Sequence, residues 1–315
     1  MNVNRMVNRL DTFQQRRRGL GFLVAVFKKY GDDQAGQYAA LLSYYALIAT
    51  FPLMLVMVSV LAFALKGNAA LQKRILDSGL TEFPVIGDQL RSNIHSLDRS
   101  GVALVVGLVV AFVGARGLAD ASQSAFNSLW NVPYADRPGF PASLLRSLLL
   151  LVLIGVGAGT TGWVAVSVTD TSKGGVVRLL LGLLGLVVNS GLFVLGFRLA
   201  TASVVATRAL VPGAICAAVA WQILLALGGL LVNHSLRGSS QVYGTFAALL
   251  GLIAWFSLQA TVTLYAVEAD VVRSRGLFPR SVTGPPSTEA DRAALSSYAQ
   301  VERRLPEERI DVHFP

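Results

Sequence analysis

Charged side chains are scarce in this 315-residue chain: Asp, Glu, Lys and Arg together make up only 14% of it. Soluble globular domains carry about 25%. The shortage is concentrated in long uncharged runs, and 53% of all residues are hydrophobic. Such a chain cannot cover a water-facing surface with charge, so the composition excludes an ordinary soluble domain and indicates a membrane protein.

Groups that perform chemistry are also few. The only cysteine, Cys216, excludes an intrachain disulfide and a thiolate metal site. The histidines, His95, His234 and His313, are scattered, so no zinc-site spacing occurs. A Gly-x-x-x-x-Gly-Lys phosphate loop is missing as well. We therefore expect no enzyme activity, no cofactor and no metal.

Six runs with few or no charges are long enough to approach or exceed the roughly 20 helical residues that cross a bilayer. They predict an all-α, polytopic membrane protein with transmembrane helices at about 38–65, 101–119, 146–169, 178–200, 209–233 and 243–270. These helices form one domain at 34–275, between a cytoplasmic N-terminal segment at 1–33 and a cytoplasmic tail at 276–315. The first run is longer than a signal peptide, so we expect it to be retained.

The positive charges predict the orientation of these helices. Nineteen of the 27 Lys and Arg residues lie on the side of the two termini and eight on the other side. Because cytoplasmic segments are enriched in Lys and Arg, both termini are predicted to be cytoplasmic, in the inner membrane. The net charge of +9 then indicates contact with anionic lipid headgroups and gives no reason to expect nucleic acid.

An amphipathic helix is predicted before the first span. Its apolar residues follow helical spacing beside basic ones and are Leu20, Leu23, Phe27 and Tyr30. This pattern is typical of a helix that lies on the cytoplasmic headgroups.

Two other segments outside the spans have their own patterns. The connection at 66–100 predicts two amphipathic helices on the external face. The tail is rich in Pro, Ser and charge, which predicts a largely disordered appendage with one short helix at 288–304.

Carboxylates at the end of the sixth span are the first candidate site. Glu268 and Asp270 follow an uncharged run, and a charge in hydrocarbon costs free energy unless it is paired. Three readings of Glu268 are open: an interfacial carboxylate that touches water, a structural ion pair with a residue such as Arg116, or a group used in transport. Arg116 also stands four residues before Asp120, so these two can pair on one helix face.

The remaining candidates are uncharged. Pro52 interrupts the first span near Tyr44 and Tyr45, and a proline kink there can shape a cavity. Asn189 lies in the fourth span, where an amide ordinarily bonds to a neighbouring helix. A structural role and a functional one are both open for these residues.

Three stretches carry a family pattern. They are AALLSYYALIATFP at 39–52, the run from Arg116 to NSLWNV at 127–132, and YGTFA at 243–247, which leads to EAD at 268–270. Together they resemble the YihY/BrkB family of bacterial inner-membrane proteins over about residues 20–275. The resemblance implies a six-helix fold with cytoplasmic termini, an association with the bacterial envelope and, in some members, resistance to serum killing.

The family's older label, ribonuclease BN, does not suit these residues, because a metal-dependent ribonuclease needs clustered His and carboxylate ligands. The Glu that the family has near the end of its last span maps to Glu268. At Asp270 the chain departs from the family, where Asn is more typical. The tail beyond residue 280 lies outside the resemblance.

The function that we expect is the transport or translocation of an amphiphilic envelope molecule such as a lipid. A kinked, Gly-rich bundle with few intramembrane charges suits a bulky, mostly apolar cargo. The alternative is a non-transporting scaffold that recruits envelope proteins through its basic N-terminal helix and tail. Membrane lipids and envelope proteins are the expected partners, and the sequence leaves the oligomeric state open.

Overall fold

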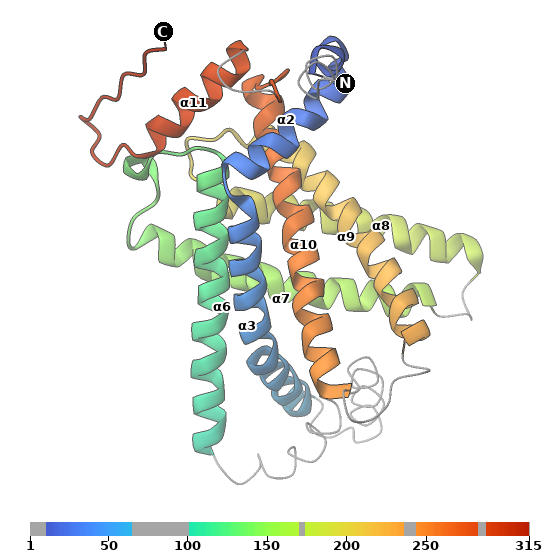
Figure 1. The fold of residues 1–315 in the computed structure, drawn as a ribbon. Helices are drawn as coiled ribbons and strands as arrows, with labels where there is room; N and C mark the ends of the chain where they lie inside the picture. The colour runs from blue at the N-terminus through green and yellow to red at the C-terminus, as the bar shows by residue number, and fades with distance from the viewer. Residues whose placement is uncertain (1–10, 65–100, 170–173, 236–243, 283–287, 315) are drawn as a thin grey trace. The chain divides into compact units, whose positions relative to one another are not determined.

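The computed structural model describes residues 11–64, 101–169, 174–235, 244–282 and 288–314. Its helices are α2 (Arg18–Asp32), α3 (Ala35–Ala64), α6 (Gly101–Leu129), α7 (Ala142–Thr169), α8 (Gly175–Ala200), α9 (Thr207–Ser235), α10 (Gly244–Arg275) and α11 (Glu289–Val301), with a short 3-10 turn, η1 (Tyr134–Asp136). No strand occurs within the described ranges, so the prediction of an all-α protein is confirmed (Figure 1).

Four of the helices, searched over their described residues, are long and apolar enough to cross a membrane. They are Ala142–Gly162 of α7, Gly175–Ala200 of α8, Thr207–Leu227 of α9 and Leu249–Arg275 of α10. These correspond to the third to sixth expected spans. The first two expected spans fall on α3 and α6, which have 30 and 29 residues. Many side chains of α3 and α6 lie outside those described, so the count of six stays a prediction, and so does the external connection at 66–100.

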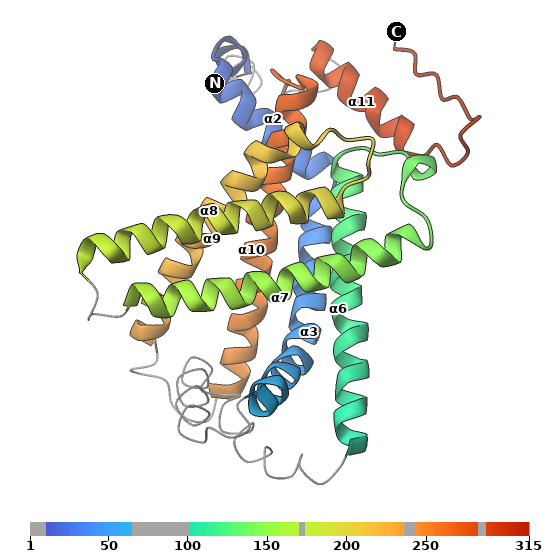
Figure 2. The same ribbon diagram turned by 180° about the vertical axis from the view of Figure 1, so that it is seen from behind.

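Helices α7 and α8 pack side by side (Figure 1; Figure 2 shows the pair from behind). Little of either span is buried in the protein, 12% for α7 and 11% for α8. Lipid tails are as apolar as leucine, so helix contacts in a membrane depend on close packing at small residues. Gly185 of α8 provides such a contact, because an added Cβ would lie 2.7 Å from Cγ1 of Val164 on α7.

The chain divides into two compact units. The larger comprises Met1–Ala39, Ala119–Leu227 and Gln259–Pro315, and the smaller comprises Ala40–Leu118 and Gly228–Leu258. All the contacts of the candidate site below are made within the larger unit.

Within the smaller unit, α3 and α6 approach each other at two glycines of α6. A Cβ on Gly117 would lie 2.4 Å from Cε1 of Tyr45, and one on Gly114 would lie 3.0 Å from Cγ2 of Ile48. Tyr45 therefore packs in a helix contact, and its ring meets that of Tyr44 edge-on with 5.4 Å between centroids. The side chain of Pro52 is not among those described, so the expected kink and cavity there stay predictions.

Helix α2 has two different faces. Its buried residues are Gly21, Ala25, Val26 and Lys29. The small ones let α2 pack closely against Val272 of α10, beside Phe278. Leu20, Leu23 and Phe27 are exposed, with Phe27 62% accessible. An exposed apolar row on a basic helix is the pattern of a helix at the headgroup level, so headgroup contact of α2 remains our prediction.

The segment after α10 differs from the sequence expectation. Arg280, Ser281 and Asp291 are buried, and α11 begins at Glu289 with Thr288 as its N-cap. The expectation of a largely disordered tail does not hold for its described part. The physical reason is that the tail's charged residues are paired with groups on α2 and in the N-terminal segment, whereas composition rules for disorder treat such residues as solvated.

Candidate functional site

A fully buried lysine, Lys29, is the centre of the candidate site. It lies in the last turn of α2, on the same face as the small residues Gly21 and Ala25, which brings its stem into the protein. Its Nζ donates to the carbonyl oxygen of Leu129 at 2.8 Å and to Oδ1 of Asn131 at 3.2 Å. Because Leu129 ends α6, the ammonium satisfies a free carbonyl at the negative end of that helix.

Two carboxylates meet this one ammonium. Asp33, four residues after Lys29, accepts a hydrogen bond from Nζ. Glu268 of α10 lies with Oε2 at 3.2 Å from Nζ and has no solvent exposure. The contact of Glu268 is an ion pair without hydrogen-bond geometry, and neither of its oxygens has a hydrogen bond among the described residues. Glu268 and Asp33 also interact with each other, so the cluster holds two acids and one base.

The buried surroundings of Asp33 disfavour the ionised form of its carboxyl group. Burial raises the pKa of the Asp33 carboxyl above its usual value, and the ammonium of Lys29 only partly offsets this. Tyr298 of α11 lies over the same place, with its ring centroid 5.7 Å from Nζ of Lys29. Burial and then the charge of Asp33 raise the pKa of the Tyr298 hydroxyl. The site is therefore a buried cluster in which two carboxyl groups share the ammonium of Lys29.

A second buried cluster lies beside the first and holds α11 in place. Oδ1 of Asp291 accepts from Nζ of Lys28 and from Nε of Arg280, both at 3.0 Å. Oδ2 of Asp291 accepts from the backbone N–H of Ser281 at 3.0 Å and from the hydroxyl of Thr288 at 2.9 Å. Burial works against the charge, but these donors lower the pKa of Asp291.

The N-terminal segment joins this second cluster through Asp11. Oδ1 of Asp11 accepts from the backbone N–H of Val282 at 3.0 Å, and Oδ2 accepts from the hydroxyl of Ser281 at 2.8 Å. Burial opposes ionisation, but the hydrogen bonds from Val282, Gln14 and Ser281 lower the pKa of Asp11 to about 2. Hydrogen bonds to the Asp11 carboxylate therefore join the N-terminal segment to the segment that follows α10.

Asp270 has a different partner from Glu268, although only two residues separate them. The backbone N–H of Gly213 on α9 donates to Oδ1 of Asp270 at 2.9 Å, and Nη2 of Arg273 donates to the carbonyl of Ala209 at 3.2 Å. An uninterrupted α-helix would join these two α9 groups to each other. Pro212 lies between them inside α9 and disturbs that turn. Asp270 therefore stabilises a proline turn, a role that the amide oxygen of an asparagine at this position would also fill.

Replacing Gly213 with alanine is expected to lower the free energy of unfolding by about 1–3 kcal/mol, through overpacking. The added Cβ would lie 2.4 Å from Oδ2 of Asp270 and 2.5 Å from the carbonyl oxygen of Ala266. Thermal unfolding of the purified protein in detergent measures the loss. The matched control is Gly191→Ala on α8, where the added Cβ meets nothing within 4 Å. Equal melting temperatures for the two variants would contradict this assignment.

Two other predicted residues, Asp120 and Asn189, belong to the larger unit. Asp120 of α6 accepts a hydrogen bond from the hydroxyl of Ser147 on α7, so it joins two helices of the larger unit. Asn189 of α8 lines a small cavity. Arg116, Tyr44 and Tyr45 belong to the smaller unit.

Sequence reasoning found Glu268 but missed its partners. From the sequence, Lys28 and Lys29 are interpreted only as charges that set membrane topology, and the tail residues Arg280 and Asp291 as part of a solvated appendage. One local signal was present: Lys29 continues the small-residue face of Gly21 and Ala25 at a spacing of four. Among the described residues, no group of three His, Cys, Asp or Glu side chains could hold a metal ion.

Comparisons with known proteins cover the part of the chain that forms this site. The sequence profile of the family described as Virulence factor BrkB matches residues 26–291. A UPF0761 membrane protein of Alcanivorax borkumensis is 28% identical over 268 residues, which are 82% of this chain and 61% of the relative. One of Alkalilimnicola ehrlichii is 30% identical over 265 residues, 80% of this chain and 58% of the relative.

The chain thus matches about 60% of the length of these relatives. No solved structure matches it. The family match includes the second half of α2 with Lys29, the α6 end that Lys29 caps, and the whole of α10. Since it extends over well more than half of the sequence, the chain belongs to the BrkB family of membrane proteins.

Proposed function

We propose that this protein translocates an amphiphilic envelope molecule such as a lipid across the bacterial inner membrane, with both termini in the cytoplasm. The charge distribution supports this orientation. The bonds from Asp11 to Ser281 and Val282 support it too, because they hold the segments before α2 and after α10 on one side. Two segments on the same side require an even number of crossings between them, as six spans would provide.

One observation carries the proposal: a fully buried Glu268 beside Asp33 and a single ammonium, at the end of a membrane span. Buried ion pairs add little stability, and well-packed apolar residues of similar size are often as stable or more so. An ionisable residue within a span is by default a candidate for function. The surplus acid lets the cluster exchange a proton or engage a polar group of a cargo.

The cargo class follows from the rest of the span region. The four described spans present apolar faces, and each has a stretch of at least 18 residues with at most two charged side chains. A small ion would need a path of charged or strongly polar groups. An amphiphile needs one polar site that contacts its headgroup and an apolar surface along the rest of its path. This combination supports a lipid-like cargo over a naked ion, and membrane lipids are the partners that we propose.

The alternative, a scaffold that recruits envelope proteins through its tail, receives less support. Arg280 is 1% exposed and Asp291 is buried, and both are occupied by contacts within the chain. A tail held in this way is not a free recruiting arm. Truncating residues 280–315 would not separate the two functions, because it also removes Tyr298 from the site around Lys29.

The test is the transfer of labelled phospholipid between leaflets of liposomes that contain the purified full-length protein. We expect transfer by the wild type and a rate about tenfold lower for Glu268→Gln, equivalent to about 1.4 kcal/mol of barrier. The amide keeps the shape of the side chain and leaves Lys29 paired with Asp33, so the variant should fold. Glu302→Gln, an exposed change at the end of α11, is the control and should transfer like the wild type.

A folded wild type that transfers no phospholipid would overturn the lipid proposal and favour the scaffold. Transfer that is equal in the wild type and in Glu268→Gln would keep the activity but remove the buried cluster from its mechanism. No catalytic chemistry is proposed for the cluster.

A further inference from the structure

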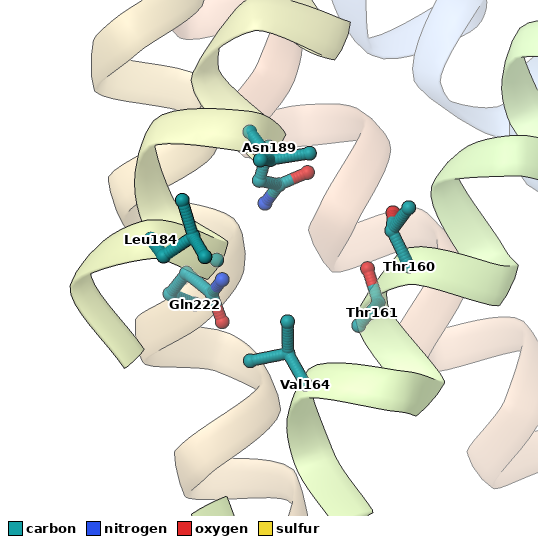
Figure 3. A pocket seen from close by; sticks show the side chains of 8 residues that line it. Thr160, Thr161, Val164, Leu184, Asn189 and Gln222 are labelled. Carbon is teal, nitrogen blue, oxygen red and sulfur yellow. The ribbon is translucent and has the colours of Figure 1, made fainter. Parts of the chain in front are cut away.

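A separate cavity with a mostly apolar lining and a few polar side chains lies among the membrane spans of the larger unit. Its volume is about 100 Å³, and it lies between α7, α8 and α9. The polar residues that line it are Thr160, Thr161, Asn189 and Gln222. Figure 3 shows the amides of Asn189 and Gln222 facing the two threonines across the open space. Val164, Leu184, Gly185 and Val188 complete the wall.

One side chain in this wall lacks a partner. Asn189 is 7% exposed, and its Nδ2 has no hydrogen bond among the described residues. Figure 3 shows this nitrogen directed into the cavity. Buried amide groups are nearly always hydrogen-bonded. A buried amide nitrogen that has no hydrogen bond and points into a cavity therefore indicates that a bound group supplies the acceptor.

The lining defines the chemistry of an occupant. No residue that lines the cavity is charged, so an ion would lose its hydration without compensation. Amide and hydroxyl groups both donate and accept, which matches a hydroxyl group. The volume is well below the roughly 300–1,000 Å³ of a pocket for a drug-sized ligand and below the ~150 Å³ of a benzene-sized cavity. A group of a few heavy atoms is the largest that fits.

We propose that this cavity binds an uncharged, hydroxyl-bearing group of the size of glycerol, with an oxygen accepting from Nδ2 of Asn189. Two sources supply this chemistry: free glycerol, or the glycerol end of a neutral lipid such as diacylglycerol. Most of the wall belongs to α7 and α8, and little of either span is buried in the protein, so a lipid could reach the cavity as well as a water-soluble molecule. The site is independent of the transport activity and of the cluster around Lys29.

The experiment measures equilibrium binding of radiolabelled glycerol and, separately, radiolabelled dioctanoylglycerol to the full-length protein in lipid nanodiscs. The test variant is Asn189→Leu, which keeps the branching and the number of heavy atoms of the side chain and removes the amide. The matched control is Ser190→Ala on the next residue, whose hydroxyl donates to the carbonyl of Leu186 instead of lining the cavity. Thr161→Val, a nearly isosteric loss of one hydroxyl, is a second variant in case the first fails to fold.

We expect saturable binding of one probe, weakened about tenfold or more by Asn189→Leu or Thr161→Val and unchanged by Ser190→Ala. The probe that binds identifies the source of the hydroxyl group. No saturable binding of either probe would mean that the cavity holds only water and would overturn the proposal. Binding that is equal in all variants would overturn it as well. Because the readout needs no translocation, failure of the transport assay leaves this result interpretable.

Discussion

Replacing Lys29 with methionine is expected to lower the free energy of unfolding by about 3–5 kcal/mol, because it leaves buried carboxylates without their counter-ion. Glu268 has no exposed surface, and Lys29 is the cation that the structure places within 4 Å of it. The loss also frees the carbonyl of Leu129 and the amide oxygen of Asn131, which both accept from Nζ. Methionine keeps the length of the stem, so the change isolates the charge.

Chemical or thermal unfolding in detergent checks this result, with Arg18→Met as the control. Arg18 begins α2 and is exposed, so its loss should change stability little. The double variant Lys29→Met with Glu268→Gln should be more stable than Lys29→Met alone, because it removes one uncompensated charge. A Lys29→Met protein as stable as the Arg18→Met protein would rule out the buried ion cluster.

The pH dependence of stability at this cluster has a definite sign. The folded state raises the pKa of Asp33 above 3.8, so it binds that proton more tightly than the unfolded chain does. This contribution is fully present below pH 3.8 and is lost as the pH rises through the folded pKa. Removing Lys29 should strengthen the trend, so the deficit of Lys29→Met is expected to shrink on mild acidification.

Asp291→Ala is the second variant with a large expected effect, again about 3–5 kcal/mol, because Arg280 would remain buried without its buried carboxylate partner. Asp32 still pairs with Arg280 at 2.8 Å, but Asp32 is partly exposed. The change also removes the acceptor of Lys28 Nζ, Ser281 N–H and Thr288 hydroxyl. We expect α11 to detach from the larger unit.

Limited proteolysis measures this detachment directly. Cleavage within residues 288–314 should be faster in Asp291→Ala than in the wild type. Glu289→Ala, an exposed change in the same first turn of α11, is the matched control and should leave the cleavage rate near that of the wild type. Unchanged protection of α11 in Asp291→Ala would show that the contacts of Asp291 do not hold the tail.

Acid should lower the stability that the tail contributes, whereas it raises the stability that Asp33 contributes. The folded state lowers the pKa of Asp291, and it lowers the pKa of Asp11 to about 2. The stability from these two groups is present above their unfolded value of 3.8 and is lost as the pH falls through their folded pKa values. Proteolysis of the tail is therefore expected to accelerate in strong acid, while the cluster around Lys29 gains from mild acidification.

Local sequence patterns predicted the positions of most of the described helices. Uncharged runs located α7, α8, α9 and α10 to within a few residues, because only a helix satisfies its own backbone in hydrocarbon. The spacing of Leu20, Leu23 and Phe27 located α2 and its exposed row. The short tail helix expected at 288–304 compares with α11 at Glu289–Val301. Each of these inferences depends on neighbours along one helix.

The class of the protein, the positions of its helices and the importance of Glu268 can be predicted from the residues alone, since they follow from hydropathy and from the cost of a charge in hydrocarbon. The partners of Glu268 depend on how the helices pack. Lys29 and Glu268 are 239 positions apart in the sequence, and Lys28 and Asp291 are 263 apart. The same lysines fit a topology signal or a buried counter-ion, and composition cannot separate these roles, because burial is a property of the packed helices and not of the residue.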